Sequence, residues 1–425
     1  MSSVLDEFAW RGMLHDATEG AADHLRGGSR VCYIGFDPTA PSLHVGSLLP
    51  IMGLAHLQRA GHSPLALVGG GTGLIGDPSG KAAERQLLTA DKARENAEGV
   101  RDQLAAFLDF EVRSNPARMA NNLDWLGAMS AVDFLRDVGK HFSVNAMLRK
   151  ESVRRRVENE ETGISFTEFA YQLLQAYDFL HLFRTHGCTV QMGGSDQWGN
   201  ITGGIELIRR VTGESAVGAV FPLVTTSSGT KFGKTEAGTV WLDPEWTSPF
   251  RFYQFWINAG DDEALRYLRF FTFLDRTAIE GLEADSAAEP HRRHAQRALA
   301  EDVTRRVHGE TGLSRARLAT EALFGGSIEG LGAGEIADVF ADVPSSQVPR
   351  SALEGEGTGI LELLADAGVA SSRGDARRSV EGGGIYLNGV RVEDPQRQVL
   401  VEDAVEGRFL VLRKGKKTYH LVEVV

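Results

Sequence analysis

The sequence predicts an α/β protein: a parallel β-sheet with crossover helices, then a helical region and a small α+β module. Up to about residue 246, short apolar runs alternate with glycine-rich turns and helical patterns, as in successive βαβ units. After Pro249 apolar residues recur at helical spacing. From Arg373 onward the chain contains an arginine-bearing helical segment, a glycine turn and an Asn388-Gly389 hairpin signal, which together indicate the final module.

Composition limits the classes of protein that this chain can be. At roughly 150 residues per domain, a chain of 425 residues predicts about three domains. The chain is 42% hydrophobic and 24% charged, so it can bury a sizeable core and is not disordered throughout. Its net charge of −12 excludes a surface that binds polyanions everywhere. Residues 373–425 carry ten Lys or Arg against eight Asp or Glu and are the only net basic part, so any nucleic-acid contact must be local.

The cysteines, the N-terminal residues and the length of the apolar runs indicate the cellular compartment. Cys32 and Cys188 lie far apart in the sequence and no Cys/His cluster surrounds them, which argues against a disulfide framework and against a bound metal. The first residues, MSSVLDEFAWRG, show no basic leader, and no apolar run is long enough for a bilayer. We therefore expect a cytoplasmic protein.

Four strands are predicted in the first half, and each is followed by a loop rich in Gly, Asp, Ser or Thr. They cover Val31–Phe36, Pro64–Val68, Thr189–Met192 and Ala219–Thr225. In open parallel sheets, ligands bind beyond the carboxyl ends of the strands. The four loops are therefore where binding and catalytic residues are expected.

The first loop leads from the strand into a helix that begins near Leu48, with Ser42 as a candidate cap. The free N–H groups of such a helix start attract anions, and Gly46 has no Cβ that would keep a nucleotide away. His44 either donates a hydrogen bond to a phosphate oxygen or has a capping or packing role. Pro50 is expected to bend the helix.

Two further loops carry groups suited to charged ligands. Residues 69–81 are rich in glycine but lack the Walker pattern, so an ATPase loop is disfavoured, and Asp77 is a candidate partner for a cationic amine. The loop after the fourth strand places Lys231 and Lys234 among glycines and hydroxyls. It is either a mobile lid whose ammonium groups follow a departing pyrophosphate or a solvated hairpin tip.

A predicted helix carries Tyr171, Gln175 and Asp178 at i, i+4 and i+7. Side chains at this spacing project from one face of a helix. A purely structural face would be apolar, so three polar groups in this register favour a ligand pocket.

These motifs resemble the class I aminoacyl-tRNA synthetases. His44-Val-Gly-Ser47 is similar to the signature written HIGH, and Lys231-Phe-Gly-Lys-Thr235 is similar to KMSKS. Four intervening segments narrow the resemblance to the bacterial-type tyrosyl-tRNA synthetases: residues 33–39, 69–81, 171–178 and 191–200. Two departures from the pattern matter: Ser47 replaces the second histidine, and Thr235 replaces the final serine. The activity is expected to survive, with altered nucleotide affinity and lid kinetics.

The resemblance implies three domains, a linker and a homodimer. They are a Rossmann-like catalytic domain over 1–246, an α-helical anticodon-binding domain over 247–326, a linker over 327–358, and a small α+β RNA-binding module of the ribosomal-protein type over 359–425. The implied substrates are L-tyrosine, ATP with Mg²⁺ and tRNA(Tyr), and no tightly bound cofactor is expected.

The resemblance also implies residue roles. Asp178 and Tyr33 would bind the phenolic hydroxyl of tyrosine, whereas Tyr171, Gln175 and Asp77 would bind its ammonium group. Gln197 and Thr72 would complete that pocket. The side chains expected around the phosphates are His44, Thr39, Lys81, Arg85, Lys231 and Lys234. The residues expected at the nucleotide are Asp37, Gly46, Ser47, Asp196 and Lys234, and Asp196 could at the same time cap the helix that starts near Ile201.

Three other functions compete with tyrosine activation. A tryptophanyl-tRNA synthetase shares both signatures, but Tyr33 and Asp178 argue for a ligand with a hydroxyl. A nucleotidyltransferase that does not use tRNA would leave the helical region and the basic module unexplained. A catalytically reduced RNA-binding paralogue should have lost the two lysines of the lid motif, and both are present.

Overall fold

The computed structural model describes residues 3–77, 89–150, 153–154, 157, 163–225, 232–235, 238–416 and 418–425, with only the backbone for Ala90, Ala93, Lys234 and Thr235. The chain divides into two compact units. Unit 1 comprises Met1–Asp243 and Gly260–Leu299, and unit 2 comprises Pro244–Ala259 and Ala300–Val425.

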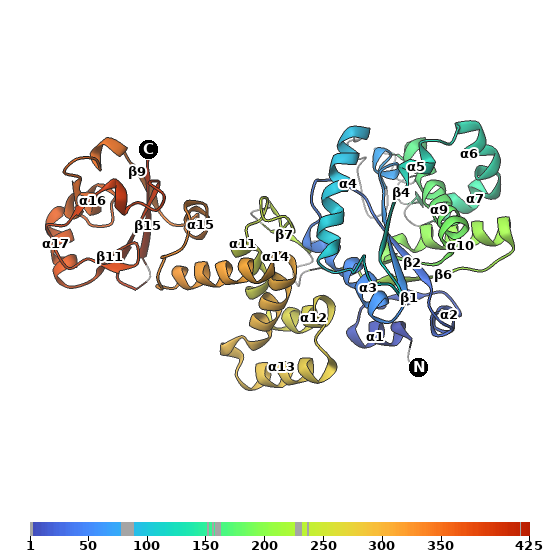
Figure 1. Ribbon diagram of the computed structural model, residues 1–425, viewed down its shortest axis with the longest axis horizontal. Helices are drawn as coiled ribbons and strands as arrows, with labels where there is room; N and C mark the ends of the chain where they lie inside the picture. Colours follow the sequence, from blue (N-terminus) through green and yellow to red (C-terminus); the bar gives the residue numbers. More distant parts are fainter. Residues whose placement is uncertain are drawn as a thin grey trace. The chain divides into compact units, whose positions relative to one another are not determined.

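Unit 1 is built on a six-stranded sheet with the order β1-β6-β5-β2-β3-β4 (Figure 1). The strands are β1 (Asp16–Ala17), β2 (Val31–Phe36), β3 (Ser63–Val68), β4 (Arg118–Asn121), β5 (Cys188–Gly194) and β6 (Val217–Phe221). Only the edge pair β1–β6 is antiparallel. Successive strands are added outward on one side from β2 to β3 and β4, and on the other side from β5 to β6. The point between β2 and β5 is therefore a topological switch point, where parallel sheets open a crevice.

The helices of unit 1 differ in how they begin, since only some have an N-cap side chain that accepts a hydrogen bond from a free N–H group. They are α1 (Val4–Arg11), α2 (Ala21–Arg26), α3 (Leu48–Arg59), α4 (Ala90–Ala105), α5 (Leu123–Leu126), α6 (Ala131–Asp137), α7 (Val144–Leu148), α9 (Phe166–His186), α10 (Trp198–Thr212), α12 (Asp261–Phe271) and α13 (Arg276–Ala288). In α9 a capping box joins Ser165 and Glu168, and Gly187 ends the helix with φ of 63°. Lys234–Thr235 (β7) and Gly238–Thr239 (β8) form a separate antiparallel pair.

The apolar core on one face of this sheet fixes α9 in place. Phe179 and Leu182 of α9 pack in one cluster with Tyr33 of β2, Leu65 of β3 and Ile208 of α10. All five side chains are essentially inaccessible to solvent. Since α9 carries three of the predicted site residues, this packing determines where their side chains lie relative to β2.

The predicted parallel sheet with crossover helices is confirmed, with differences at the strand ends. The strand Val31–Phe36 has the predicted bounds, whereas the fourth strand ends at Phe221, because Pro222 has no N–H with which to continue the ladder. β1 and β4 were not predicted, since both are short and β4 reads Arg-Met-Ala-Asn without a regular alternation. Pro50 lies in the first turn of α3, where its missing N–H costs no helical bond, so the predicted bend has no cause there.

Unit 2 combines helices with a five-stranded sheet of order β12-β11-β14-β15-β9. Its helices are α11 (Pro249–Ile257), α15 (Ala333–Val339), α16 (Ile360–Asp366), α17 (Arg373–Glu381) and the greater part of α14 (His294–Leu323), which kinks at Gly309. The strands are β9 (Ser345–Val348), β11 (Ile385–Leu387), β12 (Val390–Arg391), β14 (Phe409–Lys414) and β15 (Thr418–Val424), with β10 (Thr358–Gly359) and β13 (Gln398–Val399) as a separate pair. Asn388 and Gly389 have φ of 51° and 81°, which is the geometry of the predicted hairpin turn.

Two predicted boundaries differ from the structure. The range 327–358, expected to be a linker, contains α15 and β9, and β9 pairs in parallel with β15 as the edge of the C-terminal sheet. Its glycine and serine content suggested a linker, but Ile336, Val339 and Val348 are buried. The helices predicted after Pro249 are present, but residues 260–299 belong to unit 1 and the rest to unit 2. In the parts of the chain that the structure describes, no helix combines the length and apolarity needed to cross a membrane.

We predict that Arg11 is a major contributor to the stability of unit 1. Its guanidinium is buried and donates to the backbone oxygens of Arg269, Thr272 and Leu274, at the end of α12 and just beyond it. Arg11→Ala should lower the free energy of unfolding by about 3 kcal/mol, because buried acceptors lose a charged donor. Arg26→Ala, which breaks only exposed ion pairs, should cost less than about 1 kcal/mol in the same denaturant titration. Equal losses for the two variants would contradict the assignment.

Candidate active site

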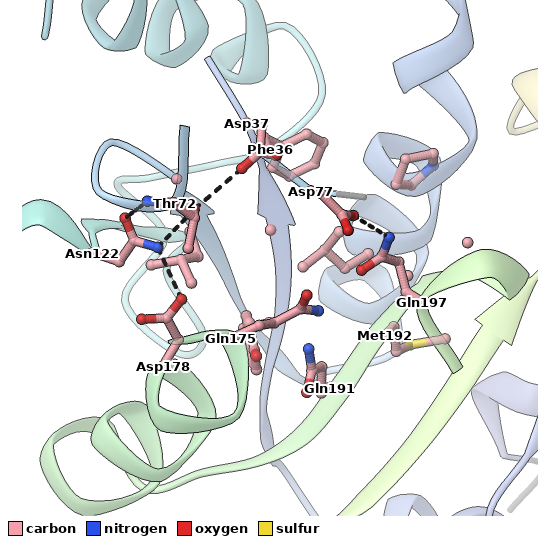
Figure 2. A pocket seen from close by; sticks show the side chains of 18 of the residues that line it. Phe36, Asp37, Thr72, Asp77, Asn122, Gln175, Asp178, Gln191, Met192 and Gln197 are labelled. Atoms are coloured by element: carbon pink, nitrogen blue, oxygen red, sulfur yellow. Dashed lines mark hydrogen bonds between the residues drawn. The ribbon is translucent and has the colours of Figure 1, made fainter. Parts of the chain in front are cut away.

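A pocket opens at the switch point, beyond the carboxyl ends of β2 and β5 (Figure 2). Its walls come from β2, β5, the loop after β3 and the face of α9 that carries the i, i+4, i+7 triad. The polar residues among its lining are Tyr33, Asp37, Thr72, Asp77, Asn122, Tyr171, Gln175, Asp178, Gln191 and Gln197. The prediction that the α9 triad shares one pocket is thereby confirmed.

Asp178 is a buried carboxylate held by two neutral donors. Asn122 Nδ2 donates to Oδ2 at 2.8 Å, and Trp125 Nε1 donates to Oδ1 at 2.7 Å. Burial raises the pKa of Asp178 to about 7, although both hydrogen bonds act to lower it. Each carboxylate oxygen has a second lone pair, so Asp178 can still accept a hydrogen bond from a ligand.

Tyr33 supplies a second oxygen to the same pocket. Its hydroxyl is buried and has no hydrogen-bond partner among the described residues. Its ring lies 5.3 Å from that of Phe179, centroid to centroid, which fixes the side chain. Burial, followed by the nearby Asp178, raises the pKa of Tyr33 well above its usual value. A buried hydroxyl without a partner is rare in folded proteins and indicates a place for a polar ligand group.

Other polar side chains form two hydrogen-bonded groups around the pocket, one centred on Asp37 and one that includes Asp77 and Gln197 (Figure 2). Asp37 accepts from Thr72 Oγ1 at 3.2 Å and from Tyr171 Oη at 3.4 Å. Gln197 Nε2 donates to Asp77 at 2.7 Å. Asn200 Nδ2 donates to Gln175 Oε1 at 2.9 Å, which orients the Gln175 amide. Two carboxylates and several amide and hydroxyl groups therefore face one another at fixed positions, an arrangement suited to a small zwitterionic ligand.

Glycine is required where the backbone approaches these side chains. A Cβ at Gly69 would lie 2.3 Å from Asp37 Oδ1 and 2.5 Å from Thr72 Oγ1, so a side chain there would displace the group centred on Asp37. At Gly35, in contrast, a Cβ would meet nothing within 4 Å, because that residue faces open space in the pocket.

A groove adjoins the pocket and shares Asp37, Asp77 and Gln197 with it. The groove is also lined by His44, Gly46, Ser47 and Asp196, together with apolar residues of the segment 221–225. The His44 ring packs edge-on against Trp241 at 6.0 Å. A Cβ at Gly46 would lie 2.7 Å from that ring, so glycine allows His44 to fold over the start of α3. The groove is large enough for a second, elongated ligand to reach the pocket.

The structure brings together most of the predicted site residues. Tyr33, Thr72, Asp77, Tyr171, Gln175, Asp178 and Gln197 line the pocket, and Asp37, His44, Gly46, Ser47 and Asp196 line the groove. Thr39 is exposed and lines neither cavity. Lys81, Arg85 and Lys231 lie outside the described residues, as does the side chain of Lys234.

Two local predictions are wrong. Asp196 does not cap a helix: it lies in a 3₁₀ turn, Ser195–Gln197, and α10 begins at Trp198 without a side-chain cap. Ser42 does not cap α3 either, because the 3₁₀ turn Val45–Ser47 precedes that helix and Ser42 Oγ donates to the backbone oxygen of Leu43.

Three pocket or pocket-supporting residues were missed from the sequence. Asn122 and Trp125 follow β4, the strand that the pattern did not reveal, so nothing placed them near Asp178. Gln191 lies in β5, buried, and its Oε1 has no partner among the described residues. A glutamine within an apolar strand was a signal that could have identified it. The described residues contain no group of three His, Cys, Asp or Glu side chains placed to hold a metal ion.

Comparisons with known proteins match nearly the whole chain. A family model described as tRNA synthetases class I (W and Y) matches residues 26–325, and a model of the tyrosine–tRNA ligase SYY-like C-terminal domain matches residues 335–422. The chain is 55% identical to a tyrosine–tRNA ligase of Roseiflexus castenholzii over 425 residues, covering 100% of both chains. It is 52% identical over 422 residues to the enzyme of Geobacillus stearothermophilus, covering 99% of each chain.

Solved structures support the same relationship. A C-terminally truncated mitochondrial tyrosyl-tRNA synthetase of Aspergillus nidulans superposes with a TM-score of 0.69 at 31% identity, covering 76% of this chain and 95% of that one. A tryptophanyl-tRNA synthetase of Plasmodium falciparum gives a TM-score of 0.51 at 13% identity, covering 79% and 87%, which is a likeness of fold alone.

The raised pKa of Asp178 predicts a particular pH dependence. Because the folded-state pKa of about 7 exceeds the unfolded value of 3.8, the folded protein holds the proton more tightly, and this contribution to stability is complete below pH 4 and lost as the pH rises through 7. Asp178→Asn cannot titrate. The melting temperature of the wild type, minus that of the variant, should therefore fall steadily from pH 4 to pH 8. A difference that stays constant or rises over this range would show that Asp178 is not a buried acid.

Proposed function

Because this chain belongs to the class I tRNA synthetase family, among its tyrosine–tRNA ligases, we propose that the pocket binds L-tyrosine and the adjoining groove binds ATP. The enzyme activates tyrosine with ATP, forming tyrosyl-adenylate and pyrophosphate, and then transfers the tyrosyl group to the 3′ end of tRNA(Tyr). One observation carries the site assignment: buried Asp178 and the Tyr33 hydroxyl, which has no hydrogen-bond partner among the described residues, line the same pocket.

The phenol of tyrosine matches the end of the pocket formed by these two residues. Its hydroxyl can donate to Asp178 and accept from Tyr33, which would give the Tyr33 hydroxyl a partner and Asp178 a third hydrogen bond. Phenylalanine would desolvate the same groups, leave the Tyr33 hydroxyl unpaired and offer Asp178 no donor, at a cost of several kcal/mol. Tyrosyl-tRNA synthetases are themselves the standard case of such discrimination without editing.

The other end of the pocket suits the ammonium group of the substrate. Asp77 contributes a carboxylate, and Tyr171 and Gln175 contribute oxygens from the same helix as Asp178. We propose that these three hold the ammonium group while Gln197 and Thr72 complete the wall. Asp37 already accepts hydrogen bonds from Thr72 and Tyr171 and faces both cavities, so it can orient the substrate beside the nucleotide.

The first reaction step needs positioning rather than a protein nucleophile. A carboxylate oxygen of tyrosine attacks the α-phosphorus of ATP, and the P–O bond to pyrophosphate breaks with its electron pair leaving on pyrophosphate. We propose that His44, Thr39, Lys81, Arg85, Lys231 and Lys234 stabilise the negative charge of the phosphates, and that Gly46, Ser47, Asp196 and Lys234 contact the nucleotide. Mg²⁺ would arrive with ATP as part of the substrate.

The second step uses the terminal ribose of the tRNA. A ribose hydroxyl attacks the carbonyl carbon of the adenylate, and AMP departs with the electron pair of the broken C–O bond. We propose that the basic C-terminal module binds the tRNA, since Arg373 and Arg377 of α17 line a polar pocket with Gln396 and Gln398. The helical region 247–326 is the proposed anticodon-binding part.

Exposed apolar side chains support a homodimer. Met119, Val132, Leu135, Val144, Leu148 and Phe166 are all at least 36% exposed, and they lie between β4 and the start of α9. The elements that carry them pack into one cluster around Val138, Met147 and Leu173, so these side chains extend from a common scaffold. A surface of this kind is typical of an interface between subunits. The free and buried Cys32 and Cys188 support the proposed cytoplasmic location.

The test of the proposed function is ATP–pyrophosphate exchange with each of the twenty amino acids. Tyrosine should stimulate exchange and phenylalanine and tryptophan should not. Exchange with tryptophan alone would favour the tryptophanyl alternative, and exchange with none would favour an RNA-binding protein without this activity.

Tyr33→Phe should reduce selectivity more than it reduces catalysis in general. Loss of one neutral hydrogen bond to the phenol should lower kcat/KM for tyrosine about fivefold, about 1 kcal/mol, and leave the value for phenylalanine nearly unchanged. Exchange kinetics with both amino acids measure the ratio. An equal decrease for tyrosine and phenylalanine would show that the Tyr33 hydroxyl does not contact the substrate hydroxyl.

Leu135→Asp should weaken the proposed homodimer, because it places a charge in the apolar interface. Sedimentation velocity should show the wild type as a dimer and the variant shifted toward monomer. Val390→Asp is the matched control, since Val390 is 63% exposed, close to the 59% of Leu135, but lies in unit 2. A monomeric wild type, or the same shift in the control, would overturn this interface.

A further inference from the structure

Gln103 on α4 forms hydrogen bonds with the loop that leads into the groove-lining residues Leu43 and His44. Its Oε1 accepts from the backbone N–H of Leu43 at 2.8 Å, and its Nε2 donates to Ser42 Oγ at 2.9 Å. Ser42 Oγ in turn donates to the backbone oxygen of Leu43 at 2.7 Å and accepts from the backbone N–H of Asp243 at 3.2 Å. Ser42 is buried, and its partners Gln103 and Asp243 are half-buried.

The same face of α4 makes two more contacts with this loop. Asn96 Nδ2 donates to the backbone oxygen of Pro38 at 2.8 Å. A Cβ at Gly99 would lie 2.5 Å from the backbone oxygen of Pro41, so glycine is needed for the helix to approach this closely. Asn96, Gly99 and Gln103 are at i, i+3 and i+7 and therefore share a face of the helix. One stripe of α4 thus contacts the loop from Pro38 to Leu43.

The bond to Asp243 connects this loop to a second one. The N–H of Leu242 donates to the backbone oxygen of Leu43 at 2.9 Å, and the N–H of Val45 donates to that of Val240 at 3.0 Å. Residues 240–243 therefore run alongside residues 42–45. They follow directly after the motif Lys231–Thr235 and β8 in the chain, and the N–H of Val240 donates to the backbone oxygen of Gly233.

The position of His44 depends on this arrangement. His44 forms an isolated bridge with Trp241, and both His44 and Leu43 line the groove. The loop around Ser42 has no helix or strand of its own, so its backbone groups rely on side chains for partners. Gln103 and Ser42 supply those partners to both segments at once, directly beside His44 of the first signature motif.

We propose that Gln103, acting through Ser42, is a positioning residue for ATP: it fixes the two signature segments relative to each other and so places His44 at the groove. Gln103 itself lines neither the pocket nor the groove. The inference rests on the proposed function, because it assigns the groove to ATP.

The experiment compares Gln103→Met, Ser42→Ala and the double variant by pyrophosphate exchange with saturating tyrosine and varied ATP. Gln103→Met keeps the length of the side chain and removes both hydrogen bonds. It should lower kcat/KM for ATP about ten- to a hundredfold, as expected for displaced reacting groups, and change KM for tyrosine less than about twofold. Because the two residues act as one unit, the double variant should be little worse than the more affected single variant.

Gln58→Met is the matched control. Gln58 also binds loop backbone through its amide, donating to Asp109 and Asn115 and accepting from the N–H of Asp109, but that loop lines neither cavity. The control should lose a similar amount of thermal stability and keep its ATP kinetics.

Hydrogen exchange supplies a readout that does not depend on activity. In Gln103→Met, the amides of Leu43 and Asp243 should exchange faster, whereas in Gln58→Met they should not. The proposal is overturned if kcat/KM for ATP stays within twofold in Gln103→Met, or if the control loses as much. If the wild-type chain shows no tyrosine-dependent exchange while Leu43 and Asp243 still loosen together, the proposed function has failed and the structural coupling stands.

Discussion

The site depends on one constraint: a carboxylate that is buried away from water must keep enough hydrogen bonds for the folded state to tolerate its burial. Asn122 and Trp125 supply two of them to Asp178, and neither carries a charge. A cationic partner would have compensated the charge of Asp178 and lowered its pKa. With neutral donors, the carboxylate stays buried, keeps a raised pKa and retains an unused lone pair that faces the pocket. Much of the surrounding architecture, from the short strand β4 to the capping of α9, brings those donors to the acid.

Pocket residues could be predicted from the sequence where they belong to a strong local pattern. The triad on α9 was predicted because three polar residues at i, i+4 and i+7 share a helix face that would be apolar if it only packed against the core, and glycine-rich loops after strands indicated the edge of the sheet where ligands bind. Asn122 and Trp125 were not predicted, because β4 has four residues and only its pairing with β3 makes it a strand. The contacts of Asn122 and Trp125 with Asp178 thus arise only in the tertiary structure, and no local sequence pattern predicts them.

The same distinction explains the misjudged boundaries. Residues 327–358 read as a linker because glycine, serine and glutamate dominate them, yet a few buried apolar side chains are enough to recruit β9 to the C-terminal sheet. Ser42 read as a helix cap because it precedes a helical pattern, but its hydroxyl instead joins two loops that are 200 residues apart in the chain. In both places a long-range contact, which the local pattern does not encode, decided the structure.

Placing Tyr171, Gln175 and Asp178 on a single continuous helix has a consequence for molecular size. A helix rises about 1.5 Å per residue, so the first and last of these residues are separated by about 10 Å along an axis that cannot stretch. Under the proposed assignment, Asp178 binds the hydroxyl of the ligand while Tyr171 and Gln175 bind its amine, so this fixed separation sets the length of the ligand. An aromatic alcohol with one more methylene between ring and amine would then reach one set of groups and miss the other, and the helix would select by length without any additional wall.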